Sequence, residues 1–208
     1  FNDFAFHEKD DINLIKSGRE WYGEEFDLTT TYDFSFGFPN RVTSEPIAVR
    51  TDVIARNVSS NTTYSVNVNG SNSNITVSSI SGQYFSDYAK KASSCESVTS
   101  GSSNVNVSVT YNKVGDALGW LNYIEVNVRR NLTMNGAQMA FRDAESMGAG
   151  NVAEFSLGNA SSGLTIWDVT NPVDVKKQEF QLNSGKAVFK LETDSLKEFF
   201  AFTGTSFE

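Results

Sequence analysis

Residues 105–111 read Val-Asn-Val-Ser-Val-Thr-Tyr, the clearest alternation of apolar and polar side chains in the chain. Successive side chains of a β-strand point to opposite faces, so this run has one apolar face and one polar face. Such a pattern is typical of an antiparallel sheet with one face against a core and the other in water. The stretch therefore predicts an all-β fold.

Similar runs lie on both sides of this stretch. Asn69-Gly70 is a strong hairpin signal between two of them. Within residues 120–130 the apolar positions fall out of phase, which predicts a bulge near Asn122 and Tyr123. Residues 83–98 fit two strands or one helical stripe, with two strands favoured. The pattern predicts strands at residues 34–38, 47–55, 64–68, 75–77, 105–111, 120–130, 152–157, 164–169, 173–178, 187–191 and 199–202.

The spacing of these runs sets the fold class. About twelve short strands, a few short helical turns and no long amphipathic helix predict an antiparallel β-sandwich, with a jelly-roll topology preferred. We expect residues 1–30 to be a lead-in packed on the sandwich and residues 31–208 to form one β-sandwich domain. A boundary within residues 134–150, which contain glycines and no clear alternation, is the weaker alternative.

Composition excludes several classes of function. A net charge of −8 argues against nucleic-acid binding, which depends on clustered Lys and Arg. No apolar run reaches the roughly 20 residues that cross a bilayer, so no direct membrane insertion is expected. The chain begins without a signal-peptide pattern, and both ends lack a terminal signature, so we expect a fragment of a longer protein.

Few residues could carry chemistry. Cys95 is the only cysteine and His7 the only histidine, and no basic residue near Cys95 in sequence could activate its thiol. One histidine cannot build a multi-histidine zinc site. The carboxylates show no spacing that singles out an acid and base pair. The sequence therefore predicts no catalytic residues, no metal site and no cofactor.

The segment from residue 7 to residue 26 combines charges with aromatic residues. Asp10 and Asp11 could cap a short helical turn over residues 12–16, which Gly18 would end. We expect Trp21 to be buried and Arg19 to pair with a nearby carboxylate, Glu24 being the candidate. The segment would then clamp one edge or end of the sandwich.

The same segment carries a family resemblance. Residues 13–24 read Asn-Leu-Ile-Lys-Ser-Gly-Arg-Glu-Trp-Tyr-Gly-Glu, which resembles a block of the PorU-type sortases, gingipain-like cysteine peptidases of the type IX secretion system in Bacteroidetes. Further blocks similar to those of the family follow in family order. They lie at residues 119–132, 134–142, 166–172 and 198–202. Residues 47–103 contain no block that matches.

The resemblance implies a function for this part of a larger protein. In that family the Cys-His pair belongs to a caspase-like domain that follows, and neither catalytic residue maps onto this chain. The chain would be a non-catalytic N-terminal β domain of an extracellular sortase at the outer membrane, which removes C-terminal sorting domains from secreted cargo. Its partners would be the downstream peptidase domain and outer-membrane attachment-complex proteins. The expected contact residues are Trp167, Phe199, Phe200 and Phe202.

Two other functions compete with this interpretation. A stand-alone carbohydrate-binding or adhesive module of a secreted bacterial protein would share the fold class and the acidic charge. A hydrolase in its own right would need a convergent set of catalytic residues, which the sequence does not offer. The sortase domain is the preferred interpretation.

Overall fold

The alternating stretch at residues 105–111 lies in strand β8 (Asn104–Asn112) of the computed structural model, which describes residues 1–204. Val105, Val107 and Val109 are buried, and the polar residues between them lie on the other face of the strand. β8 pairs antiparallel with β3 (Thr31–Gly37) on one side and with β5 (Thr62–Val68) on the other. The most regular run of the sequence thus occupies the centre of a sheet.

By its internal contacts the chain forms two compact units. The first, called the jelly-roll unit here, comprises Phe4–Phe38 and Thr43–Val128. The second, called the C-terminal unit, comprises Phe1–Asp3, Pro39–Val42 and the chain from Arg129 onward. Each is an arrangement of antiparallel strands with a core of its own.

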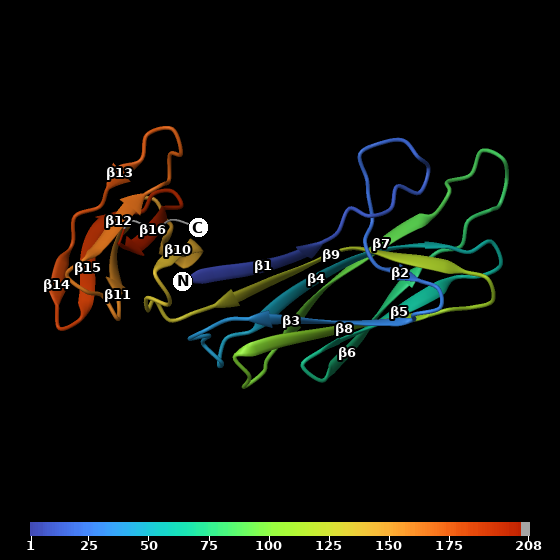
Figure 1. Cartoon of the computed structure of the whole chain (residues 1–208), viewed down its shortest axis with the longest axis horizontal. Coiled ribbons are helices and arrows are strands. Elements are labelled where there is room, and N and C mark those ends of the chain that lie inside the picture. Colours follow the sequence, from blue (N-terminus) through green and yellow to red (C-terminus); the bar gives the residue numbers. More distant parts are fainter. Residues whose placement is uncertain (205–208) are drawn as a thin grey trace. The chain divides into compact units, whose positions relative to one another are not determined.

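The jelly-roll unit has two layers of strands (Figure 1). One layer has the order β3-β8-β5-β6 and the other β1-β9-β4-β7, while a short β2 pairs with β9. If β2 is left out and the other eight strands of the unit are numbered 1 to 8 along the chain, the two layers have the strand orders 1-8-3-6 and 2-7-4-5. These are the two strand orders of a jelly roll. The remaining bounds are β1 Asn2–Glu8, β2 Glu25–Phe26, β4 Ile47–Arg56, β6 Ser71–Val77, β7 Lys90–Val98 and β9 Leu118–Arg129.

Three aromatic rings pack in the core between these layers. Phe26 meets Tyr64 with ring centroids 5.3 Å apart, and Tyr64 meets Tyr111 at 4.6 Å. The buried Tyr64 hydroxyl donates a hydrogen bond of 2.8 Å to the Ile54 carbonyl oxygen. A Cβ at Gly119 would lie 2.1 Å from that hydroxyl oxygen. This position of β9 therefore requires glycine.

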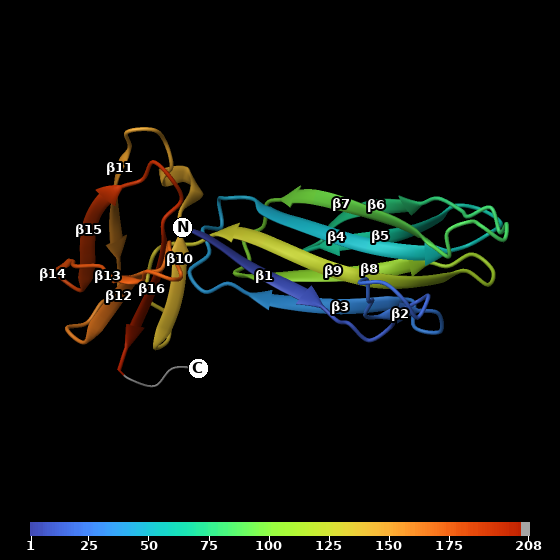
Figure 2. The same ribbon diagram turned by 90° about the horizontal axis from the view of Figure 1, so that it is seen from above.

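The C-terminal unit contains two groups of strands (Figure 2). One group has the order β13-β12-β16-β10, and the other is a three-stranded sheet of order β11-β15-β14. Phe141, Phe155, Phe189 and Phe199 stack in its core, with centroid separations such as 5.3 Å for Phe155 and Phe189. The bounds are β10 Gln138–Arg142, η1 Ala144–Ser146 (a 3₁₀ turn), β11 Val152–Leu157, β12 Leu164–Asp168, β13 Lys176–Lys177, β14 Gln181–Asn183, β15 Lys186–Glu192 and β16 Glu198–Thr203.

The predicted fold class is confirmed. The described residues form an all-β structure of antiparallel sheets with sixteen strands, more than the expected number because several are very short. The division of the chain differs from the expectation of a lead-in at residues 1–30 followed by one domain at residues 31–208. Residues 2–8 form strand β1, and residues 129–204 belong to a separate unit.

Three local predictions, the hairpin, the bulge and the strands at residues 83–98, can also be compared with the structure. Asn69 and Gly70 both have positive φ, at 47° and 92°, and join β5 to β6 in the predicted hairpin. The bulge is also confirmed, because Asp52 pairs with Tyr123 while Val53 pairs with Leu121, which leaves Asn122 as the extra residue. Residues 83–98 contain one strand, β7, rather than two strands or a helix.

Within residues 1–204, no helix has both the length and the apolar character required to cross a lipid bilayer.

Candidate functional site

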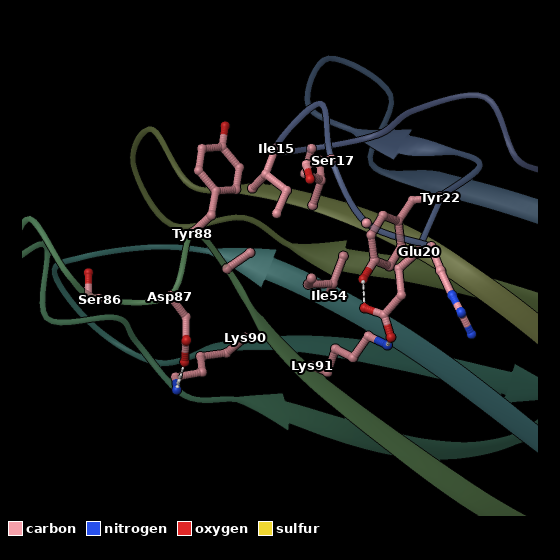
Figure 3. Close-up of a pocket in the computed structure, with 14 residues that line it drawn as sticks. Ile15, Ser17, Glu20, Tyr22, Ile54, Ser86, Asp87, Tyr88, Lys90 and Lys91 are labelled. Atoms are coloured by element: carbon pink, nitrogen blue, oxygen red, sulfur yellow. Dashed lines mark hydrogen bonds and ion pairs between the residues drawn. The ribbon is translucent and has the colours of Figure 1, made fainter.

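A pocket with a volume of about 770 Å³ opens on the jelly-roll unit. One wall comes from the loop at residues 14–20, and the opposite wall from residues 86–91, which lead into β7. Figure 3 shows Ile15 and Ser17 of the loop above Ile54, with Tyr88 on one side and Tyr22 on the other. The lining residues are Leu14, Ile15, Ser17, Gly18, Arg19, Glu20, Tyr22, Ile54, Ser86, Asp87, Tyr88, Ala89, Lys90 and Lys91.

The floor of the pocket is apolar and fixed. Tyr22 and Ile54 are buried together with Trp120 in a small cluster, and Leu14 and Ala89 pack against it. The loop is tied at its base, because the backbone N–H groups of Ile12 and Tyr22 each donate to the other residue's carbonyl oxygen at 2.9 Å. An apolar group that entered the pocket would therefore meet a surface that is already in place.

Charged side chains on the walls are joined in pairs. The Tyr22 hydroxyl donates to Glu20 Oε2 at 3.0 Å, Glu20 forms an ion pair with Lys91, and Lys90 forms one with Asp87 (Figure 3). The hydrogen bond from Lys91 holds the pKa of Glu20 below its ordinary value. Burial raises the pKa of Tyr22 far above its ordinary value, so the hydroxyl stays protonated and acts as a donor.

Arg19 is the exception among these charges. It is exposed on the pocket wall and forms no ion pair within residues 1–204. The lining therefore carries three cations, Arg19, Lys90 and Lys91, against two carboxylates. In a chain with a net charge of −8, the pocket is locally positive.

Exposed aromatic side chains stand beside the pocket. Tyr88 is 40% exposed, and the Arg56 guanidinium lies 4.4 Å from the centroid of its ring. Tyr84 and Phe85, a few residues earlier on the same loop, are 99% and 89% exposed. A group of solvent-exposed aromatic side chains often marks a binding surface.

The predictions for the lead-in segment fail at two residues. Trp21 is 43% exposed and its neighbour Tyr22 is buried, because the bridge between Ile12 and Tyr22 directs the latter inward. Arg19 does not pair with Glu24. No helix forms at residues 12–16, where a turn instead has Asn13 Oδ1 accepting from the Ser17 backbone N–H at 2.9 Å.

Glu24 forms a buried charge cluster that the sequence did not suggest. Its side chain is 6% exposed, and its Oε1 lies 3.0 Å from His7 Nε2 and 3.2 Å from Lys9 Nζ. His7 thus pairs with a carboxylate. Cys95 is exposed on β7. The structure does not bring Cys95 and His7 together as a catalytic pair, and residues 1–204 contain no cluster of three or more potential metal ligands.

The four expected contact residues lie on β12 and β16, on two faces. Phe199 is 1% exposed and belongs to the core of the C-terminal unit. Phe200 and Phe202 alternate with it and point to the other face, where Trp167 lies opposite Phe200 and 4.7 Å from the Phe202 ring centroid. Trp167 is 36% exposed. These three residues, called the aromatic strip here, remain candidates for a contact.

Comparison with known proteins bears on the fold. No protein-family model and no curated protein sequence matches the chain. The crystal structure of dimeric latent PorU from Porphyromonas gingivalis is similar to it, with a TM-score of 0.82 and 20% sequence identity. The match covers 98% of this chain and 20% of the PorU chain. The fold of this chain is thus similar to that of part of the PorU chain, and this chain spans about one fifth of the length of the PorU chain.

Proposed function

We propose that the chain is a non-catalytic N-terminal β domain of a cell-surface type IX sortase, which supports or docks the cysteine peptidase domain that follows it. The observation that carries the proposal is the similarity to PorU over 98% of the chain and only 20% of the PorU chain. The sequence blocks at residues 13–24, 119–132 and 166–172 support the same family.

Within residues 1–204, no observed contact joins His7 to Cys95. His7 pairs with Glu24, and Cys95 is exposed on β7 without a base that any observed contact supplies. A sortase needs a nucleophile whose base lies within hydrogen-bond reach. In the proposal, the catalytic nucleophile and its base belong to the peptidase domain, outside this chain.

The aromatic strip is the proposed contact with the peptidase domain. Trp167, Phe200 and Phe202 lie on the face of β12 and β16 that does not contribute to the core of the C-terminal unit. Covering a partly exposed Trp removes apolar area from water, which is worth roughly 25 cal/mol per Å². Attachment-complex proteins at the outer membrane are the proposed second class of partner.

Hydrogen exchange tests the docking role. The 208-residue chain and the longer protein that continues into the next domain are compared segment by segment. We expect residues 164–168 and 198–203 to gain protection in the longer protein, with residues 62–68 as the internal control. Equal protection in both proteins would contradict docking through the aromatic strip. A gene that continues into a domain other than a caspase-like peptidase would contradict the sortase assignment.

A further inference from the structure

We propose that the pocket between the 14–20 loop and residues 86–91 binds an extended peptide that places one apolar side chain in the pocket, with carboxylates on either side of it. The argument uses residues of the jelly-roll unit alone and does not depend on the proposed sortase function. The site has three parts: the apolar floor, the excess of cations around it, and the edge of β7 that forms no hydrogen-bonded strand pair among the described residues.

The pocket selects an apolar group because four of its five charged side chains already pair with one another. Glu20 accepts from Tyr22 and pairs with Lys91, and Asp87 pairs with Lys90. A sugar would need several unpaired donors and acceptors to hold its hydroxyl groups. The floor formed by Tyr22 and Ile54, with Leu14 and Ala89 against it, instead offers carbon surface. An aliphatic or aromatic side chain gains most from such a floor.

The charges around the pocket select the flanking residues. Arg19 is an exposed cation that forms no ion pair with any residue the structure describes, and with Lys90 and Lys91 it outnumbers the carboxylates of Glu20 and Asp87. A guanidinium binds a carboxylate through two parallel hydrogen bonds. Carboxylates next to the apolar residue of the ligand would therefore be favoured and lysines disfavoured.

The geometry of β7 selects an extended chain. The pocket wall includes Lys90 and Lys91, the first two residues of β7. Among the described residues β7 ends its sheet, with β4 as its hydrogen-bonded neighbour. The opposite edge of β7 forms no hydrogen-bonded strand pair among the described residues, although β6 of the other layer lies close to β7, and the nine residues of β7 contain neither Pro nor Gly. A peptide strand added to such an edge gains main-chain hydrogen bonds, and a pocket reads one of its side chains.

The loop aromatics would cover the bound peptide. Tyr84 and Phe85 are almost fully exposed, and they precede the pocket wall at residues 86–91. Rigid aromatic groups provide large contact area at low entropic cost, and they are frequent among residues that dominate binding energy. Their exposure in the free chain is explained if they pack on the ligand.

Fluorescence anisotropy with synthetic peptides tests the proposal. The probe is fluorescein-labelled Ser-Glu-Glu-Leu-Glu-Glu-Ser, and the comparison peptides replace Leu by Ser, replace Glu by Lys, or carry backbone N-methyl groups at alternate residues. We expect each change to weaken binding at least about tenfold, which corresponds to roughly 1.4 kcal/mol. Higher salt should weaken the acidic peptide as well, because screening reduces the attraction to the cations.

Variants locate the site on the 208-residue chain. Arg19→Glu and the double variant Tyr84→Ser with Phe85→Ser change exposed residues, so the fold should persist, which circular dichroism verifies. Each should weaken binding of the acidic peptide by about fivefold or more. Lys186→Glu, an exposed charge reversal in the C-terminal unit, is the matched control and should leave it unchanged.

Several results would overturn the proposal. They are no binding of the acidic peptide at millimolar concentration, equal binding of the Leu and Ser peptides, or full affinity for the N-methylated peptide. Binding of cellohexaose or laminarihexaose in place of every peptide would also overturn it and would assign the pocket to carbohydrate.

Discussion

The imidazole Nε2 of His7 lies 3.0 Å from Oε1 of Glu24, so the only histidine of the chain joins strand β1 to the segment just before β2. Lys9 approaches the same carboxylate oxygen at 3.2 Å. Glu24 is buried, and its other oxygen, Oε2, has no hydrogen-bond partner. The cluster therefore ties the end of β1 to the segment that leads into β2 through one carboxylate.

Replacing Glu24 by Ala should destabilise the chain. The change removes the carboxylate that accepts from both His7 and Lys9, and we expect a loss of roughly 1–3 kcal/mol in the free energy of unfolding. Urea denaturation followed by Trp fluorescence measures it. Glu25→Ala, at the exposed neighbouring residue, is the control and should change stability by less than about 0.5 kcal/mol. Equal effects of the two variants would show that the cluster is not stabilising.

Asp143 should make the C-terminal unit sensitive to acid. Burial disfavours its charge, but hydrogen bonds from Arg129, at 2.6 and 3.1 Å, outweigh burial and hold the pKa of Asp143 below its ordinary value of 3.8. A lowered pKa in the folded state stabilises the fold above that ordinary value, and the contribution disappears as the pH falls through the folded-state pKa. Asp143→Asn should therefore be less stable than the natural chain near neutral pH.

The difference in the free energy of unfolding between Asp143→Asn and the natural chain should shrink as the pH falls below about 3.8. Urea denaturation at a series of pH values measures it. Glu145, which pairs with Arg129 but is 70% exposed, supplies the control variant Glu145→Gln. A constant difference between Asp143→Asn and the natural chain over the whole pH range would contradict this account.

Gly119 and Tyr64 should show strong energetic coupling. An Ala Cβ at residue 119 would lie 2.1 Å from the Tyr64 hydroxyl oxygen and 3.0 Å from its Cζ, and Tyr64 is fully buried. Gly119→Ala should cost about 3 kcal/mol through overpacking, and Tyr64→Phe about 1 kcal/mol through the lost hydrogen bond to Ile54. The double variant should lose roughly 1–2 kcal/mol less than the sum. If the losses in the free energy of unfolding are additive in a double-mutant cycle, the core relaxes around the two substitutions independently.

Neighbouring aromatic residues in the lead-in should differ in importance. Tyr22 is 3% exposed and packs with Ile54 and Trp120, so Tyr22→Ala should cost roughly 3–5 kcal/mol. Trp21 is 43% exposed, and Trp21→Ala should cost less than about 1 kcal/mol. Thermal melts of both variants measure the difference. The reverse order would mean that Trp21 anchors the segment after all.

The sequence predicted strands in both units because an alternating pattern indicates burial on one face. Residues 105–111 alternate between apolar and polar side chains, and residues 152–157 lie between Gly and Asn residues that are typical of turns. Both stretches are strands in the structure. The bulge at Asn122 was predictable because one extra residue shifts the phase of every apolar position after it. Alternation does not state which strands are neighbours, so the division into two units at Arg129 was not visible in it.

The candidate site was harder to predict because its parts are distant in sequence. The pocket combines residues 14–22, Ile54 and residues 86–91. Residues 14–22 drew attention through the family resemblance, but their charges gave no indication that Glu20 pairs with Lys91. Strand β1 was assigned to the lead-in because its charged residues obscured the alternation. The signal that could have revealed the pocket is the aromatic group Tyr84, Phe85 and Tyr88 in an otherwise Ser-rich loop.

The place of β1 in the jelly roll also constrains the order of folding. Among the strands of the jelly-roll unit β1 (Asn2–Glu8) is synthesised first, yet its neighbour in that unit is β9 (Leu118–Arg129), the last of them. Contacts between such distant segments form late, since the intervening chain must first be closed into a loop. The unit therefore cannot complete its sheet until about residue 129 has been synthesised. Until then β1 is an unpaired strand, and the exposed backbone groups of such a strand favour aggregation.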